Sequence, residues 1–247
     1  MENTSKPLPG AGTLISDSWK LFTTTWNTSV KTSSLLIYVG LAYFVAGLLV
    51  RVNPALGLLT AVISLAGSVF TVWISIRVIL TMMNLEAGKQ PMASVEEGKK
   101  AWTLFWSLIW VGFLTGLVVF GASLLFILPG IYFGVALYFS QLILIDQGTR
   151  GTQALGASRA LVRGRWWPTF WRLIAGGFVF GLLLAIVMGI VIGGIAMLIG
   201  SSSFSDGPSD PLVVGILQLI QMVIVAAFMP LMTGFQVKLY RALQKTR

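Results

Sequence analysis

The chain has 247 residues and a formal net charge of +9, yet only 10% of its residues are charged and 56% are hydrophobic. A soluble domain carries roughly 25% charged residues, so this composition excludes a domain that faces water over most of its surface. Histidine and cysteine are absent, which removes the commonest general base and metal ligand together with disulfide and thiolate chemistry. We therefore expect an all-α integral membrane protein that is not an enzyme and holds no cofactor or metal.

The segment before residue 33 predicts an amphipathic helix at the membrane interface. Trp19, Phe22 and Trp26 recur on one helical face with Ile15, while Asp17 lies on another. Such a helix lies in the interface with its apolar side toward the acyl chains. We therefore place Trp26 at headgroup depth, where tryptophan is enriched.

Two apolar runs follow, at 33–51 and 56–82. Each is long enough to cross a bilayer, which takes ~20 residues. Arg77 lies inside the second run. Such a charge can snorkel to the nearby surface, and we also hypothesise that it pairs with Asp146, because an unpaired charge at this depth is costly. In the connection that follows, Glu96 and Glu97 stand beside two lysines and are typical of an exposed loop.

The run from Ala101 to Ile145 contains 45 residues without a charge. This run is too long for a single span at ~1.5 Å per residue. Pro129 and Gly130 favour a tight turn within it, which predicts spans at 103–128 and 130–146, with Asp146 closing the second. Trp102 precedes the first of these spans in the position of an interfacial anchor.

The stretch around residues 154–172 combines an amphipathic helix with a cluster of arginines and tryptophans. Indoles favour headgroup depth, and arginines near the surface attract anionic lipid by about 1 kcal/mol each. The alternative is that these arginines only set the topology. The candidate headgroup and interface residues are Arg159, Arg163, Arg165, Trp166, Trp167 and Trp171, with Trp26 and Trp102 in similar places earlier in the chain.

The last two spans are predicted at 172–199 and 211–236, followed by a basic tail at 237–247. Small residues recur every fourth position in the first of these spans, which permits close approach of another backbone. This small-residue stripe consists of Gly177, Gly181, Ala185, Gly189 and Gly193. Its partner is another span of the same chain, which we favour, a second copy of the chain, or a lipid tail.

The lysines and arginines predict the orientation of the six spans. Fifteen of the 17 basic residues fall on one side if both termini are cytoplasmic, as the positive-inside rule requires. Asp206 and Asp210 then lie in the external loop before the last span. The positive charge is spread over four cytoplasmic segments without a nucleic-acid motif, so we expect no nucleic-acid partner.

A serine followed eight residues later by a tryptophan occurs three times, each time before a span. The three pairs are Ser18 and Trp26, Ser94 and Trp102, and Ser158 and Trp166. This spacing indicates a possible three-unit repeat within a single membrane domain of residues 1–247. Each unit would hold an amphipathic interfacial helix and two spans, in units of about 13–82, 92–146 and 152–236.

The stretch from Leu128 to Ile174 resembles a bacterial multi-span family. That family includes the membrane domain of glycerophosphoryl diester phosphodiesterase and the YciC-like inner-membrane proteins. The shared residues are Pro129, Gly130, Ile131, Asp146, Ala154, Leu155, Ser158, Gly164, Trp166 and Trp167. The resemblance implies a fold and an inner-membrane location, because nothing in this chain corresponds to the soluble catalytic barrel of the phosphodiesterase.

These observations favour a non-enzymatic multi-pass protein that acts as an envelope scaffold or accessory subunit. Its expected partners are membrane lipids, above all anionic ones, and other membrane subunits. The alternative is a transporter or channel for small molecules or lipids, for which intramembrane charges such as Arg77 are typical. The sequence leaves the oligomeric state open.

Overall fold

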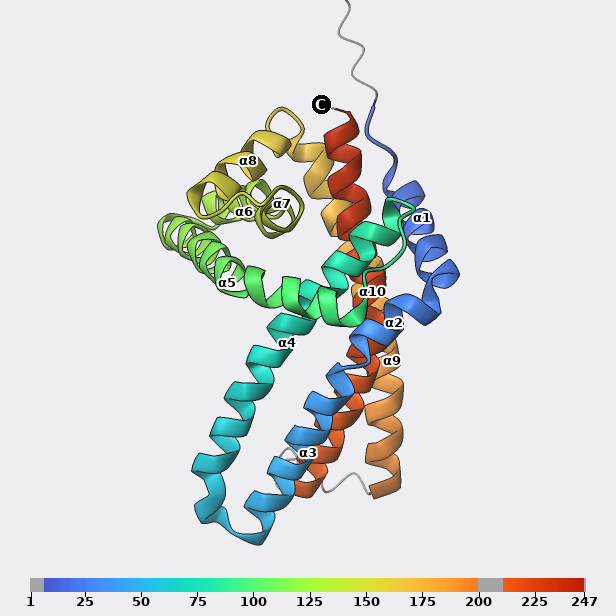
Figure 1. Ribbon diagram of the computed structural model, residues 1–247, viewed down its shortest axis with the longest axis vertical. Helices are drawn as coiled ribbons and strands as arrows, with labels where there is room; N and C mark the ends of the chain where they lie inside the picture. Colours follow the sequence, from blue (N-terminus) through green and yellow to red (C-terminus); the bar gives the residue numbers. More distant parts are fainter. Residues whose placement is uncertain (1–6, 200–210, 247) are drawn as a thin grey trace, which may run out of the picture.

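The computed structural model describes residues 7–199 and 211–246, and every regular element in these ranges is a helix (Figure 1). The predicted external loop with Asp206 and Asp210 lies outside the described residues. In chain order the elements are α1 (Ala11–Thr24), α2 (Trp26–Ser33), α3 (Leu36–Val52), the 3-10 turn η1 (Pro54–Leu56), α4 (Gly57–Glu86), α5 (Ser94–Leu125), α6 (Ile127–Ala136), α7 (Ser140–Gln147), α8 (Thr152–Val162), α9 (Trp166–Ile199) and α10 (Pro211–Lys245).

Six helical segments of the described chain have the length and composition to cross a membrane. They are Trp26–Val52, Pro54–Glu86, Ser94–Leu125, Ile127–Gln147, Trp166–Ile195 and Val213–Lys245. Each contains one of the six predicted spans almost completely, and most extend beyond it. The all-α class and the multi-pass membrane character are therefore confirmed.

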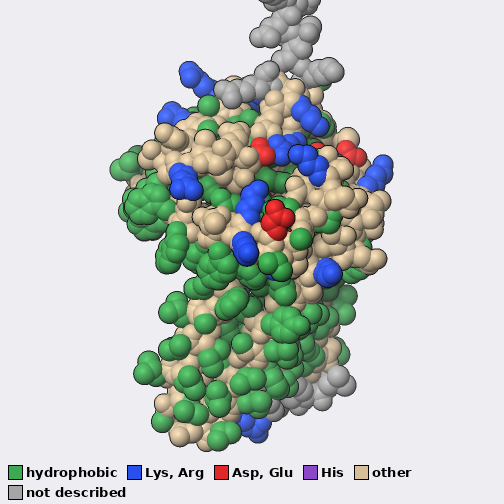
Figure 2. Space-filling view, in the orientation of Figure 1, with side chains coloured by type: hydrophobic (Ala, Val, Ile, Leu, Met, Phe, Trp, Pro, Cys, Tyr) green, Lys and Arg blue, Asp and Glu red, His purple; other side chains and the backbone are tan. Residues whose placement is uncertain are grey.

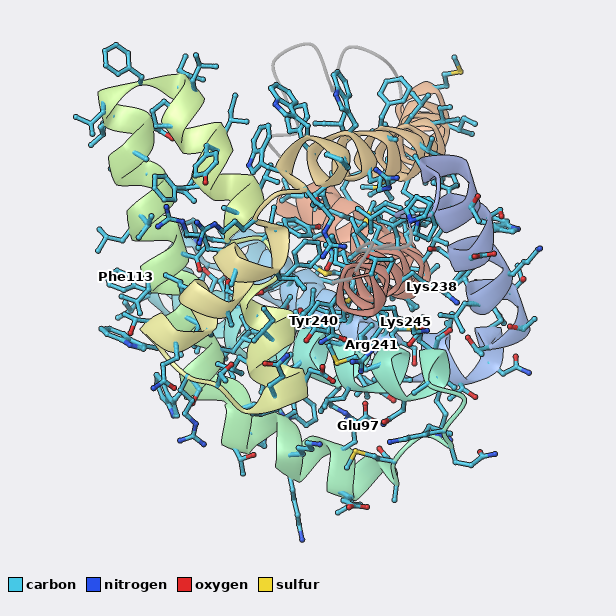
Figure 3. The ribbon with its side chains drawn as sticks, turned by 90° about the horizontal axis from the view of Figure 1, so that it is seen from above. Glu97, Phe113, Lys238, Tyr240, Arg241 and Lys245 are labelled. Carbon is cyan, nitrogen blue, oxygen red and sulfur yellow. The ribbon has the colours of Figure 1, made fainter. Side chains whose placement is uncertain are left out.

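The long helices run in two directions. Helices α3, α4, α9 and α10 follow the long axis of the molecule, whereas α5 lies across it with α6 to α8 beside it (Figure 1). The view from above agrees, because α10 is seen end-on and α5 is seen along its length (Figure 3). Helix α10 is central and packs most extensively on α3, and also on α4, α1 and α2.

The buried core lies at one end of the molecule, which we call the charged end. Figure 2 shows most lysines, arginines and acids gathered over this end, and a mainly hydrophobic surface along the rest of the long axis. The largest fully buried side chains come from α3, α4, α7, α10 and the break between α6 and α7, and include Leu36, Ile76, Met82, Phe139, Leu144, Leu231, Leu239, Tyr240 and Leu243. The opposite part is a bundle of α3, α4, α9 and α10, which we call the lower bundle.

The described part of the predicted basic tail at 237–247 belongs to the last long helix. Helix α10 continues to Lys245, and Val237, Leu239 and Leu243 are fully buried. The tail was assigned on its positive charge, but its apolar residues recur at helical spacing and pack on neighbouring helices. The end of α10 is thus the best-buried part of that helix.

The turn inside the 45-residue run lies earlier than predicted. Helix α5 ends at Leu125 and α6 begins at Ile127, so the connection is the single extended residue Phe126. Pro129 and Gly130 lie in the first turns of α6. Proline is tolerated there because the first N–H groups of a helix have no intrahelical partner.

The predicted amphipathic stretch after residue 153 forms helix α8, but its apolar side contacts protein. On α8, Leu155, Leu161 and Val162 are buried in the core, whereas the apolar side of a helix at the membrane interface faces acyl chains. The Ser158 hydroxyl, which is fully buried, donates to Ala136 O at 2.9 Å and accepts from Phe139 N at 3.2 Å. It thereby joins α8 to the break between α6 and α7. The segment before Trp102 is not a separate helix, because Ser94 already begins α5.

The small-residue stripe of α9 makes no close contact within the chain. No atom lies within 4 Å of a Cβ placed on Gly177, Gly181, Gly189 or Gly193, and Ala185 is exposed. The favoured prediction of packing against another span of this chain is therefore wrong. The close contact falls one residue earlier, where Gly176 lies against the ring of Phe235 of α10, because that face of α9 is turned toward α10. A second copy and a lipid tail remain as partners of the stripe.

Candidate functional site: a basic pocket where α8 meets α9

A sharp turn joins α8 to α9 and sets the position of three arginines. Gly164 has a φ of +79°, a conformation that glycine adopts without strain. Arg163 precedes this glycine and Arg165 follows it. Helix α9 then begins at Trp166 with Pro168 in its first turn. The turn therefore places two arginines at the beginning of a helix whose next turns carry Trp167, Trp171 and Arg172.

These residues line an open pocket of about 780 Å³, which we call the basic pocket. Its other walls come from the two ends of the described chain. The lining residues are Pro7, Leu8, Arg163, Gly164, Arg165, Trp167, Pro168, Trp171, Arg172 and Thr246. Since Pro7 and Thr246 both contribute, the first and last described residues lie on the same side of the molecule.

Two of the arginines hold the pocket walls together. Arg172 donates from Nε to Pro9 O at 2.7 Å and from Nη2 to Leu8 O at 3.0 Å, which fixes the segment before α1 against α9. Arg165 donates to the Thr246 hydroxyl and to Leu243 O of α10. All of these acceptors are uncharged, so the hydrogen bonds orient the guanidinium groups without neutralising them.

Arg163 completes the pocket as an exposed side chain. Among the described residues it has no hydrogen-bond or ion-pair partner. Among the residues that the structure describes, no Asp or Glu side chain lines the pocket. Three positive charges therefore converge on one opening, and guanidinium groups in such an arrangement favour phosphate or carboxylate ligands.

The predicted tryptophans divide into two kinds. Trp167 and Trp171, one turn apart on α9, line the pocket and are more than 60% exposed. Trp166 is turned away from the opening: its indole stacks between Tyr132 and Phe170 and donates to Tyr132 O at 3.1 Å. Trp166 therefore anchors α9 to α6, and only the other two are free to contact a ligand.

The remaining interface candidates lie elsewhere. Arg159 is exposed on α8 but does not line the pocket. Trp26 packs edge-on against Phe22, and Trp102 stacks with Trp73 at 5.9 Å. The structure thus joins Arg163, Arg165, Trp167 and Trp171 and leaves these three apart. The other lining residues include Arg172, Pro7, Leu8 and Thr246, to which the sequence analysis gave no role in a site.

The hypothesised ion pair between Arg77 and Asp146 is wrong. Arg77 lies 3.6 Å from Glu97 of α5, and both side chains are almost completely buried. Thr81 donates to Glu97 Oε1 at 2.6 Å, and Arg77 donates to the Ser94 hydroxyl at 2.9 Å. The prediction that Glu97 lies in an exposed loop is therefore also wrong, because α5 begins before it and turns it toward α4.

Asp146 pairs instead with Arg241 near the end of α10. Two hydrogen bonds of 2.8 and 2.9 Å join the Arg241 guanidinium to the carboxylate, and Glu86 of α4 lies 3.7 Å from the same side chain. Tyr240 donates to Asp146 at 2.9 Å. Figure 3 shows Tyr240 and Arg241 on α10, near its end. This cluster joins α4, α7 and α10.

The fold and the basic pocket together define a multi-pass helical membrane protein with a cationic pocket at its charged end. Among the described residues, no cluster of three or more His, Cys, Asp or Glu side chains is arranged to hold a metal ion. Comparison with protein-family models, with curated proteins and with solved structures finds no match for this chain.

Proposed function

We propose that the protein binds the headgroup of an anionic phospholipid in the basic pocket and acts as a non-enzymatic scaffold or accessory subunit of the bacterial inner membrane. The observation that carries the proposal is the convergence of Arg163, Arg165 and Arg172 next to two exposed indoles, with no Asp or Glu side chain among the described lining residues. A phosphate provides the negative charge and acyl chains provide the apolar contact. Free anions such as inorganic phosphate would use the arginines alone.

The orientation belongs to the same proposal. With the charged end in the cytoplasm, most lysines and arginines lie on the side that the positive-inside rule assigns to them. The basic pocket then faces the cytoplasmic leaflet, whose anionic lipids attract juxtamembrane arginines. Trp167 and Trp171 lie at headgroup depth in this orientation, as amphipathic side chains at membrane interfaces do.

Native mass spectrometry of the detergent-purified protein tests the proposal. The protein is titrated with phosphatidylglycerol and, separately, with phosphatidylcholine of the same acyl composition. We expect Arg163→Gln to weaken phosphatidylglycerol binding about fivefold, which corresponds to ~1 kcal/mol for one arginine near the surface. Arg159→Gln is the matched control, because it removes the same charge from an exposed site just outside the pocket.

Two outcomes would reject the proposal. Equal losses for both variants would mean that the arginines act only through overall charge, and equal binding of the two lipids would mean that the pocket does not select a headgroup.

A transporter would in addition move solute across sealed proteoliposomes. Solute flux that is abolished by Glu97→Gln, which neutralises the buried acid paired with Arg77, would favour the transporter alternative.

A further inference from the structure

Helices α3 and α4 enclose a groove in the lower bundle, which we call the α3–α4 groove. Its volume is about 440 Å³, and its lining is mainly apolar, with Leu35 and Val39 on α3 and Ile63, Phe70 and Ile74 on α4. Figure 1 shows the two helices side by side along the lower bundle, with α5 lying across the chain nearer the charged end. No charged residue of the described chain lines the groove, so a ligand there is held by apolar contact.

The α3–α4 groove is a recess with a buried floor and exposed rims. Val39 and Ile74 on the floor are almost completely buried, whereas Tyr38 and Phe70 on the rims are 70% and 49% exposed. A flat surface between two helices would expose all four side chains alike. The recess is therefore a shaped, mostly apolar space of the kind that binds small ligands.

Both ends of the groove are closed by aromatic side chains. Toward the charged end, the indole of Trp73 donates to Gly98 O of α5 at 3.1 Å, and the Arg77 guanidinium lies 4.8 Å from its ring centroid. Toward the α3–α4 turn, the space between the helices is filled by Tyr43. A Cβ placed on Gly67 would lie 2.7 Å from the Tyr43 hydroxyl oxygen. A ligand therefore enters from the side, where the lower bundle presents its hydrophobic surface (Figure 2).

The dimensions of the groove suit one hydrocarbon chain and exclude a helix. Along α4 the lining extends from Ile63 to Ile74, which is ~16 Å of helix at ~1.5 Å per residue. A volume of about 440 Å³ over this length leaves a mean cross-section of roughly 27 Å². A helix ~10 Å wide has a cross-section of ~80 Å², so a helix of a second copy or of another protein can cover the groove but not fill it. An extended acyl chain is ~4–5 Å wide at carbon contact distances and fits.

The surroundings of the Trp73 end suit the headgroup of a phospholipid. Lys31, four residues before Leu35, and Lys99, which follows Gly98, are both exposed. Trp102 stacks with Trp73 and is itself exposed, as is common for tryptophan at headgroup depth. A phosphate at this end of the groove would therefore meet cations, whereas the rest of the groove meets only apolar side chains.

We propose that the α3–α4 groove binds one acyl chain of a membrane phospholipid, with the headgroup at the Trp73 end and the chain end toward Tyr43. With the charged end in the cytoplasm, this lipid belongs to the cytoplasmic leaflet. The site is separate from the basic pocket. It requires no net negative charge on the lipid, because the lysines contact the phosphate that every phospholipid carries.

Native mass spectrometry of the delipidated full-length protein in detergent tests the site. The probe is phosphatidylcholine with one palmitoyl and one oleoyl chain, a zwitterionic lipid that the basic pocket does not favour. We expect one tightly bound lipid per chain. Ala66→Trp should weaken its binding at least about tenfold, because an indole inside the groove takes the place of several buried CH₂ groups. Ala61→Trp is the matched control on an exposed position of α4 outside the groove and should bind like the wild type.

Equal affinities of the two tryptophan variants would overturn the proposal. Tighter binding of palmitate than of phosphatidylcholine would also overturn it, because the ligand would then be a free fatty acid.

Photocrosslinking of the wild-type protein in nanodiscs tests the same site without a substitution. One phosphatidylcholine carries a diazirine near the carboxyl end of an acyl chain, and another carries it at the methyl end. We expect the first to label Leu35 or Trp73 and the second to label Ile63 or Tyr43. Equal labelling of outward residues such as Val62 by both lipids would mean that only bulk lipid is present. Groove residues that neither lipid labels would mean that protein covers the groove. Either result would contradict the proposal.

Discussion

Helices α9 and α10 each pass from the charged end into the lower bundle, and their surroundings change along the way. At the charged end Thr169 and Phe180 of α9 and Tyr240 of α10 are almost completely buried. In the lower bundle Ile190 of α9 is 70% exposed and Val223 of α10 is 45% exposed. The difference indicates that the charged end fixes the fold, while the lower bundle depends on lipid as its solvent.

Arg77→Leu should have the largest effect, because it leaves Glu97 buried without its cation. Breaking a buried ion pair by removing one partner typically costs ~3–5 kcal/mol. The measurement is the free energy of unfolding in a fixed detergent. Lys99→Leu, at an exposed position of α5 close to Glu97, should cost little.

A double-mutant cycle sharpens this prediction. The effect of Arg77→Leu should shrink in a Glu97→Leu background, because the two side chains interact directly. It should stay unchanged in an Asp146→Leu background, because Asp146 belongs to the separate cluster with Arg241. Additivity with Glu97→Leu would contradict the pairing seen here.

Tyr240→Phe should have the next largest effect. It removes the hydroxyl that donates to Asp146 at 2.9 Å and accepts from Gln244 at 2.6 Å. A hydrogen bond to a charged group contributes about 1.5–3 kcal/mol. Tyr38→Phe is the matched change in the lower bundle, where the side chain is 70% exposed, and it should leave the unfolding free energy almost unchanged. Similar losses of unfolding free energy for Tyr240→Phe and Tyr38→Phe would contradict the difference between the charged end and the lower bundle.

Gly176→Ala should destabilise α9 where it meets α10. A methyl group there would overlap the Phe235 ring, which is itself buried against Phe180. Overpacking of this kind costs about 1–3 kcal/mol. Gly177→Ala is the control on the next residue, where a Cβ meets no atom within 4 Å. A greater loss at Gly177 would show that α9 is rotated relative to this structure.

Gly189→Leu should have the smallest effect, within ~0.5 kcal/mol, as is usual for substitutions at exposed positions. The space around a Cβ at Gly189 is open in the single chain. Thermal unfolding is measured at several protein concentrations. A loss that grows with concentration would mean that a second copy covers the small-residue stripe.

The sequence predicted the helical class, the six apolar helices and the cluster at the α8–α9 junction, because these follow from local composition. It did not predict Arg172, Leu8 and Thr246 as parts of one pocket, since they are brought together only by the fold. Glu97 was missed although a signal was present. It shares a helical face with Ala101 and Phe105, both buried, but the adjacent lysines suggested an exposed loop.

The small-residue stripe also shows what cannot be predicted from the sequence alone. Its spacing of four residues identifies a face of α9 that permits close approach, but periodicity cannot say which partner lies opposite. The neighbouring Gly176 faces α10 because Phe235 fills the space there. That choice depends on the rotation of α9, which is set by Trp166 and Arg172 at its start.

A density map of the protein in nanodiscs that contain phosphatidylglycerol would test the basic pocket most directly. The account predicts headgroup density within hydrogen-bonding distance of Arg163 and acyl density beside Trp167 and Trp171. Nanodiscs of phosphatidylcholine alone should lack the headgroup feature. An empty pocket in the anionic membrane, or equal density with both lipids, would contradict the central claim.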